Sequence, residues 1–409
     1  MKKNCLEWLF SWPVWIAALG YFVDIYDLTL FSIVRIPSLQ EIGVPSDKML
    51  SGGIWILNMQ MLGMLIGGLA WGILADKKGR KSVLWASILL YSTANFLNAF
   101  VWDETTYGII RFVAGFGLAG ELGVGITLVT ESLPTKVRGL GTLIVASVGV
   151  SGAIFGFFIA EWFNWRAAYL LGGILGFALL FLRMHLFDSA LFKSMLAEEQ
   201  NRPRGRLLWL FTPLSRFKRY LSCILIGIPL WAVVGILITF SPEIAKALNV
   251  EDTIIAGRCM MLCYTGLVIG DVLSCSISQL LKSRKKALFL FLTMNSILLL
   301  GYFSPLIKQP SYFYLLMFLF GLSCGYWALF VTVAAESFGT NLRATVATSV
   351  PNMVRGSVIL LTLSFQKLDS YMAIEFAAMT IVFISVLVSM IALFFLPETF
   401  HQKLDFYEK

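Results

Sequence analysis

The chain has 409 residues, of which 58% are hydrophobic and 14% are charged, and its formal net charge is +8. A soluble domain carries about 25% charged residues, so this composition excludes an ordinary soluble protein and indicates an integral membrane protein. The positive charge does not indicate nucleic-acid binding, because the basic residues lie in short connections between apolar segments, as they do on the cytoplasmic side of membrane proteins. A chain of this length is expected to divide into two subdomains.

Twelve apolar segments are long enough to cross a bilayer as helices, which takes about 20 residues each. In chain order they cover residues 12–34, 49–74, 82–101, 106–130, 138–161, 166–187, 219–240, 255–281, 287–305, 312–335, 343–366 and 372–396. Only the connection over 188–218 is long. The sequence therefore predicts an all-α integral membrane protein with twelve transmembrane helices in two pseudo-symmetric six-helix bundles, residues 1–187 and 219–409, joined by a cytoplasmic loop.

The first span carries two carboxylates, Asp24 and Asp27, three residues apart on one helical face. A charge at that depth costs about 2.5–3.5 kcal/mol on insertion scales, so an unpaired carboxylate there should be rare. One interpretation is a pair of charges that only locks helices together. The other interpretation is a proton or substrate site in a membrane transporter.

Basic residues lie on every second connection along the chain. They stand at the N-terminus, in the runs 77–81 and 282–286, at Lys136 and Arg138, and in the central loop. Because loops rich in Lys and Arg stay in the cytoplasm, we expect both termini to be cytoplasmic. The sequence has no secretory cleavage site before the first span and no N-x-Ser/Thr sequon, which favours a multi-pass protein of a bacterial inner membrane.

One stretch of the first half recurs in the second half. Residues 131–139 read Glu-Ser-Leu-Pro-Thr-Lys-Val-Arg-Gly, and residues 336–344 read Glu-Ser-Phe-Gly-Thr-Asn-Leu-Arg-Ala. Each copy follows a span, the fourth and the tenth, at the predicted cytoplasmic face. A repeat after six spans indicates two related bundles with a site between them.

Several motifs carry a resemblance to a known family. Residues 72–81, Gly-Ile-Leu-Ala-Asp-Lys-Lys-Gly-Arg-Lys, resemble the signature loop between spans two and three of the major facilitator superfamily. Residues 111–123 resemble the fourth span of its organic-acid and sugar symporters, and residues 396–400 resemble the Pro-Glu-Thr ending of its sugar porters. Residues 24–27, Asp-Ile-Tyr-Asp, are similar to the Asp-x-x-Asp motif of its aromatic-acid and metabolite:proton symporters. Span five lacks the Gly-Pro signature of the drug:proton antiporters, which disfavours drug export by that route.

The resemblance implies a carrier in which two bundles rock about a central site. It also implies that charged residues at the cytoplasmic helix ends form latches that open and close this side. These gating residues are Asp76, Gly79, Arg80, Glu131, Arg138, Glu336 and Arg343. A monomer is the state expected from the family.

Charges inside the spans form the candidate site. With a rise of about 1.5 Å per residue, Asp27 and Arg111 lie at similar depths, and Asp24 and Glu121 are nearly level. Each of the three carboxylates is a candidate for the proton-coupling residue. Arg111 either contacts a substrate anion or pairs with Asp27.

The second half contributes Arg355 in span eleven and Asp271 in span eight, which have no counterparts in the first half. Arg355 is a candidate for substrate selectivity, unless it forms a structural pair with Asp271. Five further polar or aromatic residues could add hydrogen bonds or stacking around a substrate. They are Asn58, Gln60, Tyr326, Trp327 and Asn352.

No nucleophile–base pair and no cluster of metal ligands stands out, so neither an enzyme nor a metal cofactor is expected. The sequence predicts a secondary transporter in the lipid bilayer that uses the proton gradient to import a small organic anion by alternating access. The alternatives are an exporter or facilitator of a neutral solute, such as a sugar or a drug-like compound, and a transporter-like sensor. The substrate candidates are aromatic acids, dicarboxylates, amino-acid-like solutes and polycarboxylate metal chelates.

Overall fold

The computed structural model describes residues 12–78, 80–121, 135–187, 207–400 and 408, and its regular structure there is helical. The helices of the first half are α2 (Trp12–Glu41), α3 (Met49–Lys78), α4 (Arg80–Asn98), α5 (Glu104–Leu118), α7 (Thr135–Trp162) and α8 (Trp165–Phe187). Those of the second half are α10 (Leu214–Ala232), α11 (Ser241–Ala247), α12 (Ala256–Leu280), α13 (Arg284–Leu298), α14 (Pro310–Cys324), α15 (Trp327–Glu336), α16 (Thr340–Asp369) and α17 (Ile374–Phe395). Five short helical turns connect or extend them, η1 (Ser46–Lys48), η2 (Leu207–Phe211), η3 (Val233–Ile238), η4 (Leu299–Phe303) and η5 (Pro305–Lys308).

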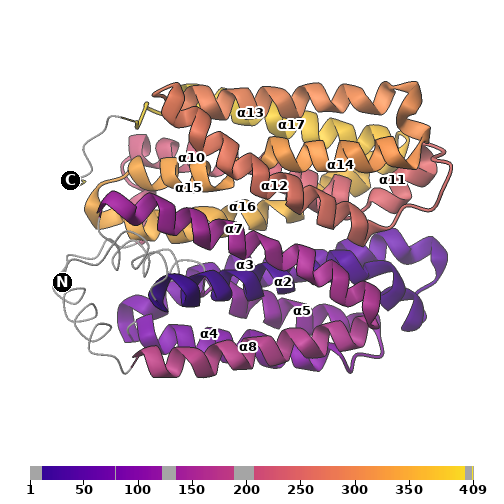
Figure 1. Cartoon of the computed structure of the whole chain (residues 1–409), viewed down its shortest axis with the longest axis horizontal. Coiled ribbons are helices and arrows are strands. Elements are labelled where there is room, and N and C mark those ends of the chain that lie inside the picture. The colour runs from indigo at the N-terminus through magenta and orange to yellow at the C-terminus, as the bar shows by residue number, and fades with distance from the viewer. Residues whose placement is uncertain (1–11, 79, 122–134, 188–206, 401–407, 409) are drawn as a thin grey trace.

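The helices form two bundles that lie against one another, as Figure 1 shows, with α2 to α8 in indigo to magenta and α10 to α17 in pink to yellow. Between the bundles, α16 packs along α3, and α12 packs along α7. α2 begins and α17 ends at the same end of the molecule, and α11 lies at the opposite end (Figure 1). The predicted all-α architecture of two helical bundles is confirmed.

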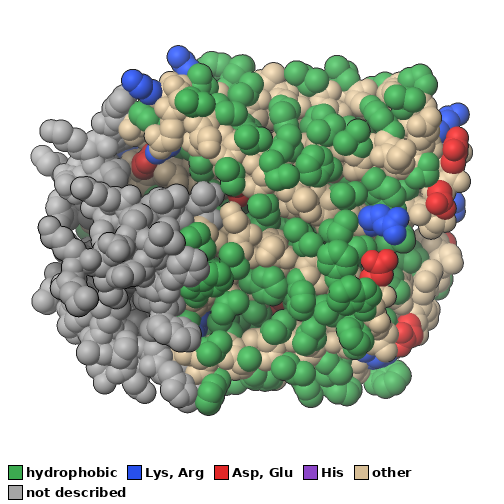
Figure 2. All heavy atoms as spheres, in the orientation of Figure 1, with side chains coloured by type: hydrophobic (Ala, Val, Ile, Leu, Met, Phe, Trp, Pro, Cys, Tyr) green, Lys and Arg blue, Asp and Glu red, His purple; other side chains and the backbone are tan. Residues whose placement is uncertain are grey.

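Ten helical segments of the described residues are long and apolar enough to cross a membrane. The two other predicted spans correspond to α4 and α5, and α5 has only 15 residues. Figure 2 shows apolar side chains over the middle of the visible face, with most charged side chains towards the two ends. This distribution fits a protein whose middle is surrounded by lipid, because apolar side chains there meet hydrocarbon and charged ones reach water.

Two predicted spans are not continuous helices where the structure describes them. The helix of the fourth span ends at Leu118 and is followed by a turn that reaches Glu121, and residues 122–134 of that prediction lie outside the described residues. The tenth span consists of α14 and α15, which are separated at Gly325 and Tyr326. Gly325 has φ −73° and ψ 48°, a conformation that does not continue an α-helix.

The same packing device occurs in both bundles. A Cβ atom built on Gly63 of α3 would lie 2.1 Å from the carbonyl oxygen of Phe112 in α5. One built on Gly266 of α12 would lie 2.2 Å from the carbonyl oxygen of Phe318 in α14. Small residues let membrane helices approach this closely, so each bundle has a helix pair in direct backbone contact.

Candidate functional site

Arg111 in α5 is paired with Asp27 in α2. Its Nη1 donates to Asp27 Oδ1 at 2.9 Å, and both side chains are fully buried. Its Nη2 donates to the carbonyl oxygen of Asp27 at 3.0 Å, and its Nη1 lies 3.3 Å from Asn95 Oδ1. The guanidinium carbon is 5.5 Å from the ring centre of Tyr169. The N-terminal bundle itself therefore holds Arg111, and of the two arrangements that the sequence left open the structure has the ion pair.

The start of α5 sets the place of Arg111. Asp103 precedes the helix, and its Oδ1 accepts the N–H of Thr106 at 2.8 Å, which satisfies one of the free donors at the helix N-terminus. The acidic Glu104 in the first turn also suits the positive end of the helix dipole. About two turns further along, Arg111 faces α2.

A second charged cluster lies around Asp24, nearly one turn before Asp27 on α2. Glu121, in the turn after α5, forms an ion pair with Arg183 of α8, and their side chains are 2% and 6% exposed. Asp24 is buried and interacts electrostatically with both residues. A Cβ atom on Gly20 would lie 2.0 Å from Arg183 Nη2, so the missing side chain leaves room for the pair. Two carboxylates and one cation carry one negative charge, which a single proton would neutralise.

Arg183 is a member of this buried cluster that the sequence interpretation missed. It lies four residues before the end of the predicted span 166–187, where a basic side chain ordinarily reaches back to the lipid headgroups. In the structure the side chain is buried instead and reaches Glu121 across the bundle. The signal that could have found it is its place inside an apolar run, next to Phe181 and Leu182, rather than after it.

Arg355 in α16 is buried in a different environment. Its side chain is 2% exposed, and among the described residues no carboxylate lies within ion-pair distance of it. The guanidinium carbon is 5.9 Å from the ring centres of Trp231 in α10 and Trp327 in α15. Asp24 and Tyr21 of the other bundle interact with it electrostatically. A buried cation without a paired anion is costly, and an anionic ligand beside it would offset that cost.

Asp271 in α12 does not pair with Arg355 in the described part of the chain. Its Oδ1 accepts the N–H of Ala328 at 3.0 Å, at the start of α15. Its Oδ2 is buried without a hydrogen-bond partner among the described residues. The alternative of a structural Arg355–Asp271 pair is therefore not the arrangement that the structure has.

Two of the predicted polar residues connect the bundles. Thr362 Oγ1 of α16 donates to Asn58 Oδ1 of α3 at 2.6 Å. Asn352 Nδ2 of α16 donates to the carbonyl oxygen of Ala119, just after α5, at 3.2 Å. Both contacts lie on the α3–α16 side of the interface between the bundles.

The other predicted residues of this set divide by role. Gln60 Nε2 donates to the carbonyl oxygen of Leu28 at 3.2 Å inside the first bundle. The hydroxyl of Tyr326 donates to the carbonyl oxygen of Ile226 at 3.1 Å inside the second bundle. These contacts serve packing within a bundle, whereas Trp327 lies beside Arg355.

At the end of the molecule away from the termini, an ion pair joins the bundles. Arg35 in α2 is fully buried, and its Nη1 and Nη2 each lie 2.7 Å from one carboxylate oxygen of Glu243 in α11. Its Nη2 also donates to the carbonyl oxygen of Thr239 at 3.2 Å, and its guanidinium carbon is 4.7 Å from the ring centre of Phe240. The bundles are closed together here, and this pair must break before they can separate at this end.

Five of the seven predicted gating residues lie wholly or partly outside the described residues. Gly79 and Glu131 lie outside the described residues. Asp76, Arg80 and Arg138 belong to α3, α4 and α7, but their side chains are outside the described part. The predicted latches of the first half therefore stay predictions.

Glu336 and Arg343, the gating residues of the second half, are described. Glu336 pairs with Arg284 at 3.3 Å and accepts a hydrogen bond from Thr399 Oγ1 at 2.7 Å. Arg343 Nε donates to the carbonyl oxygen of Ala335 at 3.2 Å. Glu336 thus ties α15 to α13, and Arg343 satisfies a carbonyl group at the end of α15.

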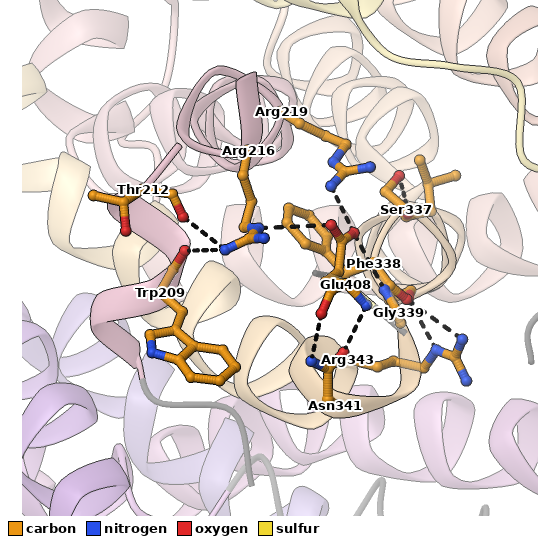
Figure 3. A network of polar contacts seen from close by, with 12 residues as sticks. Trp209, Thr212, Arg216, Arg219, Ser337, Phe338, Gly339, Asn341, Arg343 and Glu408 are labelled. Atoms are coloured by element: carbon orange, nitrogen blue, oxygen red, sulfur yellow. Dashed lines mark hydrogen bonds and ion pairs between the residues drawn. The ribbon is translucent and has the colours of Figure 1, made fainter. Parts of the chain in front are cut away.

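A further polar network surrounds Glu408 (Figure 3). Its carboxylate lies 2.6 Å from Arg219 Nη2 and 3.6 Å from Arg216 Nε, both in α10. It also accepts the N–H of Gly339 at 3.4 Å, and its own N–H donates to Asn341 Oδ1 at 3.1 Å. Glu408 therefore links the start of α10 to the turn before α16.

Comparison with known proteins identifies the family to which this fold belongs. The chain matches the family model of the Major Facilitator Superfamily over residues 17–363. It is 32% identical over 165 residues to the niacin transporter of Acinetobacter baylyi, and 31% identical over 175 residues to the 3-(3-hydroxy-phenyl)propionate transporter of Escherichia coli. The matches cover 39% and 40% of this chain and 37% and 40% of the relatives, so the matched part spans less than half of each relative.

Among solved structures, the inward open conformation of the xylose transporter from Escherichia coli matches with a TM-score of 0.70. The sequences are 15% identical, and the match covers 96% of this chain and 97% of that chain, which shows a common fold. The fold and the family match define a multi-pass membrane transporter rather than an enzyme. This chain belongs to the Major Facilitator Superfamily.

Proposed function

We propose that this transporter is a proton-coupled symporter that imports a small aromatic carboxylate across the bacterial plasma membrane. The observation that carries the proposal is the environment of Arg355. It is a buried cation at the interface between the bundles, and it has indole rings beside it instead of a carboxylate.

The chemistry around Arg355 suits both parts of such a substrate. A guanidinium group offers a planar fork of N–H donors that matches a carboxylate. Aromatic side chains such as Trp231 and Trp327 supply flat apolar surfaces against which a ring can stack. The names of two relatives support the same class, because niacin and 3-(3-hydroxyphenyl)propionate are both aromatic carboxylic acids.

The cluster of Asp24, Glu121 and Arg183 supports the proton part of the proposal. Asp24 interacts electrostatically with Arg355, so an anion that binds Arg355 weakens a favourable interaction of Asp24. A carboxylate that loses a cationic neighbour, and gains an anionic one, takes up a proton more readily. Substrate and proton would then enter the closed state together, which is symport.

Alternating access follows if the ends of the bundles open in turn. The ion pair of Arg35 and Glu243 closes one end, and we assign that end to the outside because the basic connections place the termini in the cytoplasm. The proton gradient is the proposed energy source, and a monomer is the proposed unit, since each bundle contributes to the site.

The test is uptake of labelled nicotinate, the niacin anion, into proteoliposomes that contain the purified protein. An inward proton gradient should drive accumulation of nicotinate, and nicotinamide should not compete, because it has the same ring without the negative charge. Uptake that ignores the gradient would show that the symport proposal is wrong. Equal competition by nicotinamide or by xylose would favour a carrier of neutral solutes instead.

Two variants separate the proposed roles. Arg355→Ala should weaken nicotinate binding by about 100-fold, so both gradient-driven uptake and counterflow should fall steeply at nicotinate concentrations near the wild-type KM. Asp24→Asn should lose the response to the gradient while keeping counterflow, because exchange of substrate needs no net proton movement. Binding of nicotinate without any counterflow in the wild type would indicate a sensor.

A further inference from the structure

The tenth span is broken in the middle of the C-terminal bundle, and the break leaves backbone groups that need partners. α14 ends at Cys324, and α15 begins at Trp327. The N–H of Tyr326 donates back to the carbonyl oxygen of Cys324 at 2.8 Å. The first N–H groups of a helix have no acceptor within it, and inside a bilayer no bulk water satisfies them. α15 therefore requires an acceptor from another element.

Asp271 supplies that acceptor from α12. Its Oδ1 accepts the N–H of Ala328 at 3.0 Å, and its carboxylate also interacts with the N–H of Trp327. Asp271 can come this close to the start of α15 because the residue before it on α12 is Gly270. A Cβ atom on Gly325 would lie 2.3 Å from Gly270 Cα, so the two backbones touch at the break.

The capped end of α15 carries one of the two indoles beside Arg355. Trp327 is the first residue of α15, and its ring centre lies 5.9 Å from the guanidinium carbon of Arg355. The ring centres of Trp327 and Phe330 are 5.2 Å apart. A side chain at the first position of a helix moves with the first turn. Whatever holds that turn therefore holds the indole in place.

We propose that Asp271 is a positioning residue, which caps α15 and thereby fixes Trp327 beside Arg355 for the substrate ring. This role needs a hydrogen-bond acceptor at Asp271, not a charge that titrates during transport. The proposal rests on the proposed function in one respect, that Arg355 holds the substrate carboxylate. The cap itself is independent of what the protein transports.

Substitutions at Asp271 separate the acceptor from the charge. Asp271→Asn keeps an oxygen that can accept the N–H of Ala328, whereas Asp271→Ala removes it. Ser274→Ala is the matched control, because Ser274 lies one turn further on α12 and its Oγ donates to the carbonyl oxygen of Asp271 within that helix.

In nicotinate uptake, Asp271→Ala should raise KM about 10-fold, the effect of losing a buried hydrogen bond, while the response to the proton gradient is kept. Asp271→Asn and Ser274→Ala should have KM values close to that of the wild type. An unchanged KM in Asp271→Ala would overturn the proposal. Loss of the gradient response in Asp271→Asn with counterflow intact would also overturn it, since Asp271 would then carry the proton.

Hydrogen exchange gives a readout that does not depend on the substrate. The amides of residues 325–332 should exchange faster in Asp271→Ala than in the wild type, Asp271→Asn or Ser274→Ala. If the wild type transports no nicotinate but this pattern holds, the proposed function fails and the cap stands. If exchange is unchanged in Asp271→Ala, the cap is wrong whatever the substrate.

Discussion

The buried arginines within the predicted spans have opposite surroundings in the two bundles. In the N-terminal bundle, Arg111 and Arg183 each lie against a buried carboxylate, Asp27 and Glu121 respectively. In the C-terminal bundle, Arg355 has indole rings beside it and no carboxylate within ion-pair distance among the described residues. The first two arginines therefore have their charge balanced inside their own bundle, whereas the third does not, and the proposed function assigns the third to the substrate.

The largest expected effect is a loss of stability when the buried ion pair of Arg111 and Asp27 is broken. Arg111→Ala leaves the carboxylate of Asp27 buried without its cation, and breaking a buried pair in this way costs about 3–5 kcal/mol. The thermal unfolding midpoint of the purified protein should fall accordingly. Adding Asp27→Asn to Arg111→Ala should recover much of the loss, because no unpaired charge then remains. If the double variant unfolds at the temperature of Arg111→Ala, the ion pair is not what stabilises this region.

Substitution of Arg355 should change the affinity for substrate rather than the stability of the protein. Arg355→Ala should weaken nicotinate binding by about 100-fold, as expected for loss of a buried charged hydrogen-bonding partner. The unfolding midpoint without ligand should not fall, because Arg355 gives up no ion pair. The check is the shift of the midpoint with added nicotinate, which should disappear in the variant. A drop in stability as large as that of Arg111→Ala would remove the distinction between the two arginines.

The contact between the bundles can be weakened separately at the end away from the termini. Glu243→Gln removes the charge that pairs with Arg35, and such charged hydrogen bonds contribute about 1.5–3 kcal/mol. Ser32 of α2 is buried at the interface between the bundles, where its Oγ accepts a hydrogen bond from Thr239 Oγ1 at 2.9 Å. The equilibrium should shift towards opening at this end, so a cysteine introduced as Ser32→Cys should react faster with a polar maleimide. Glu41→Gln is the control, because Glu41 pairs at 2.8 Å with Arg166 inside one bundle. Equal labelling in both variants would contradict a role for Glu243 in closing this end.

The smallest effect is expected at Glu398, after α17. Burial raises the pKa of Glu398. Hydrogen bonds from Ser283 Oγ and from the N–H groups of Arg284, Phe400 and Lys285 lower it by more than burial raises it, so the pKa is below its ordinary value. A lowered folded-state pKa stabilises the protein above the unfolded pKa of about 4.3, and the benefit is lost as the pH falls through the folded value. Because Glu398 is exposed, Glu398→Gln should cost less than about 1 kcal/mol at pH 7. Unfolding midpoints of variant and wild type should converge at acidic pH, and a constant difference would exclude this carboxylate as its cause.

Much of the fold was predictable because it depends on neighbouring residues. Apolar runs, their lengths and the basic connections predicted the helical architecture, and the motif at residues 72–81 pointed to the family. Depth along a span also brought Asp27 and Arg111 to one level, since the rise of a helix is regular. The break at Gly325 was harder, because a lone glycine in an apolar run is compatible with an unbroken membrane helix.

The amino-acid sequence by itself determined that this is a helical membrane protein, because hydropathy is a property of consecutive residues and survives any arrangement of the helices. The transporter class followed from the resemblance of its motifs to a known family. Only the tertiary structure decided which buried charges meet. The pairing of Arg183 with Glu121 and of Arg35 with Glu243, and the cap that Asp271 provides for α15, depend on how each helix is rotated and which neighbour it packs against. Those contacts join residues far apart in the chain, and no local pattern contains them.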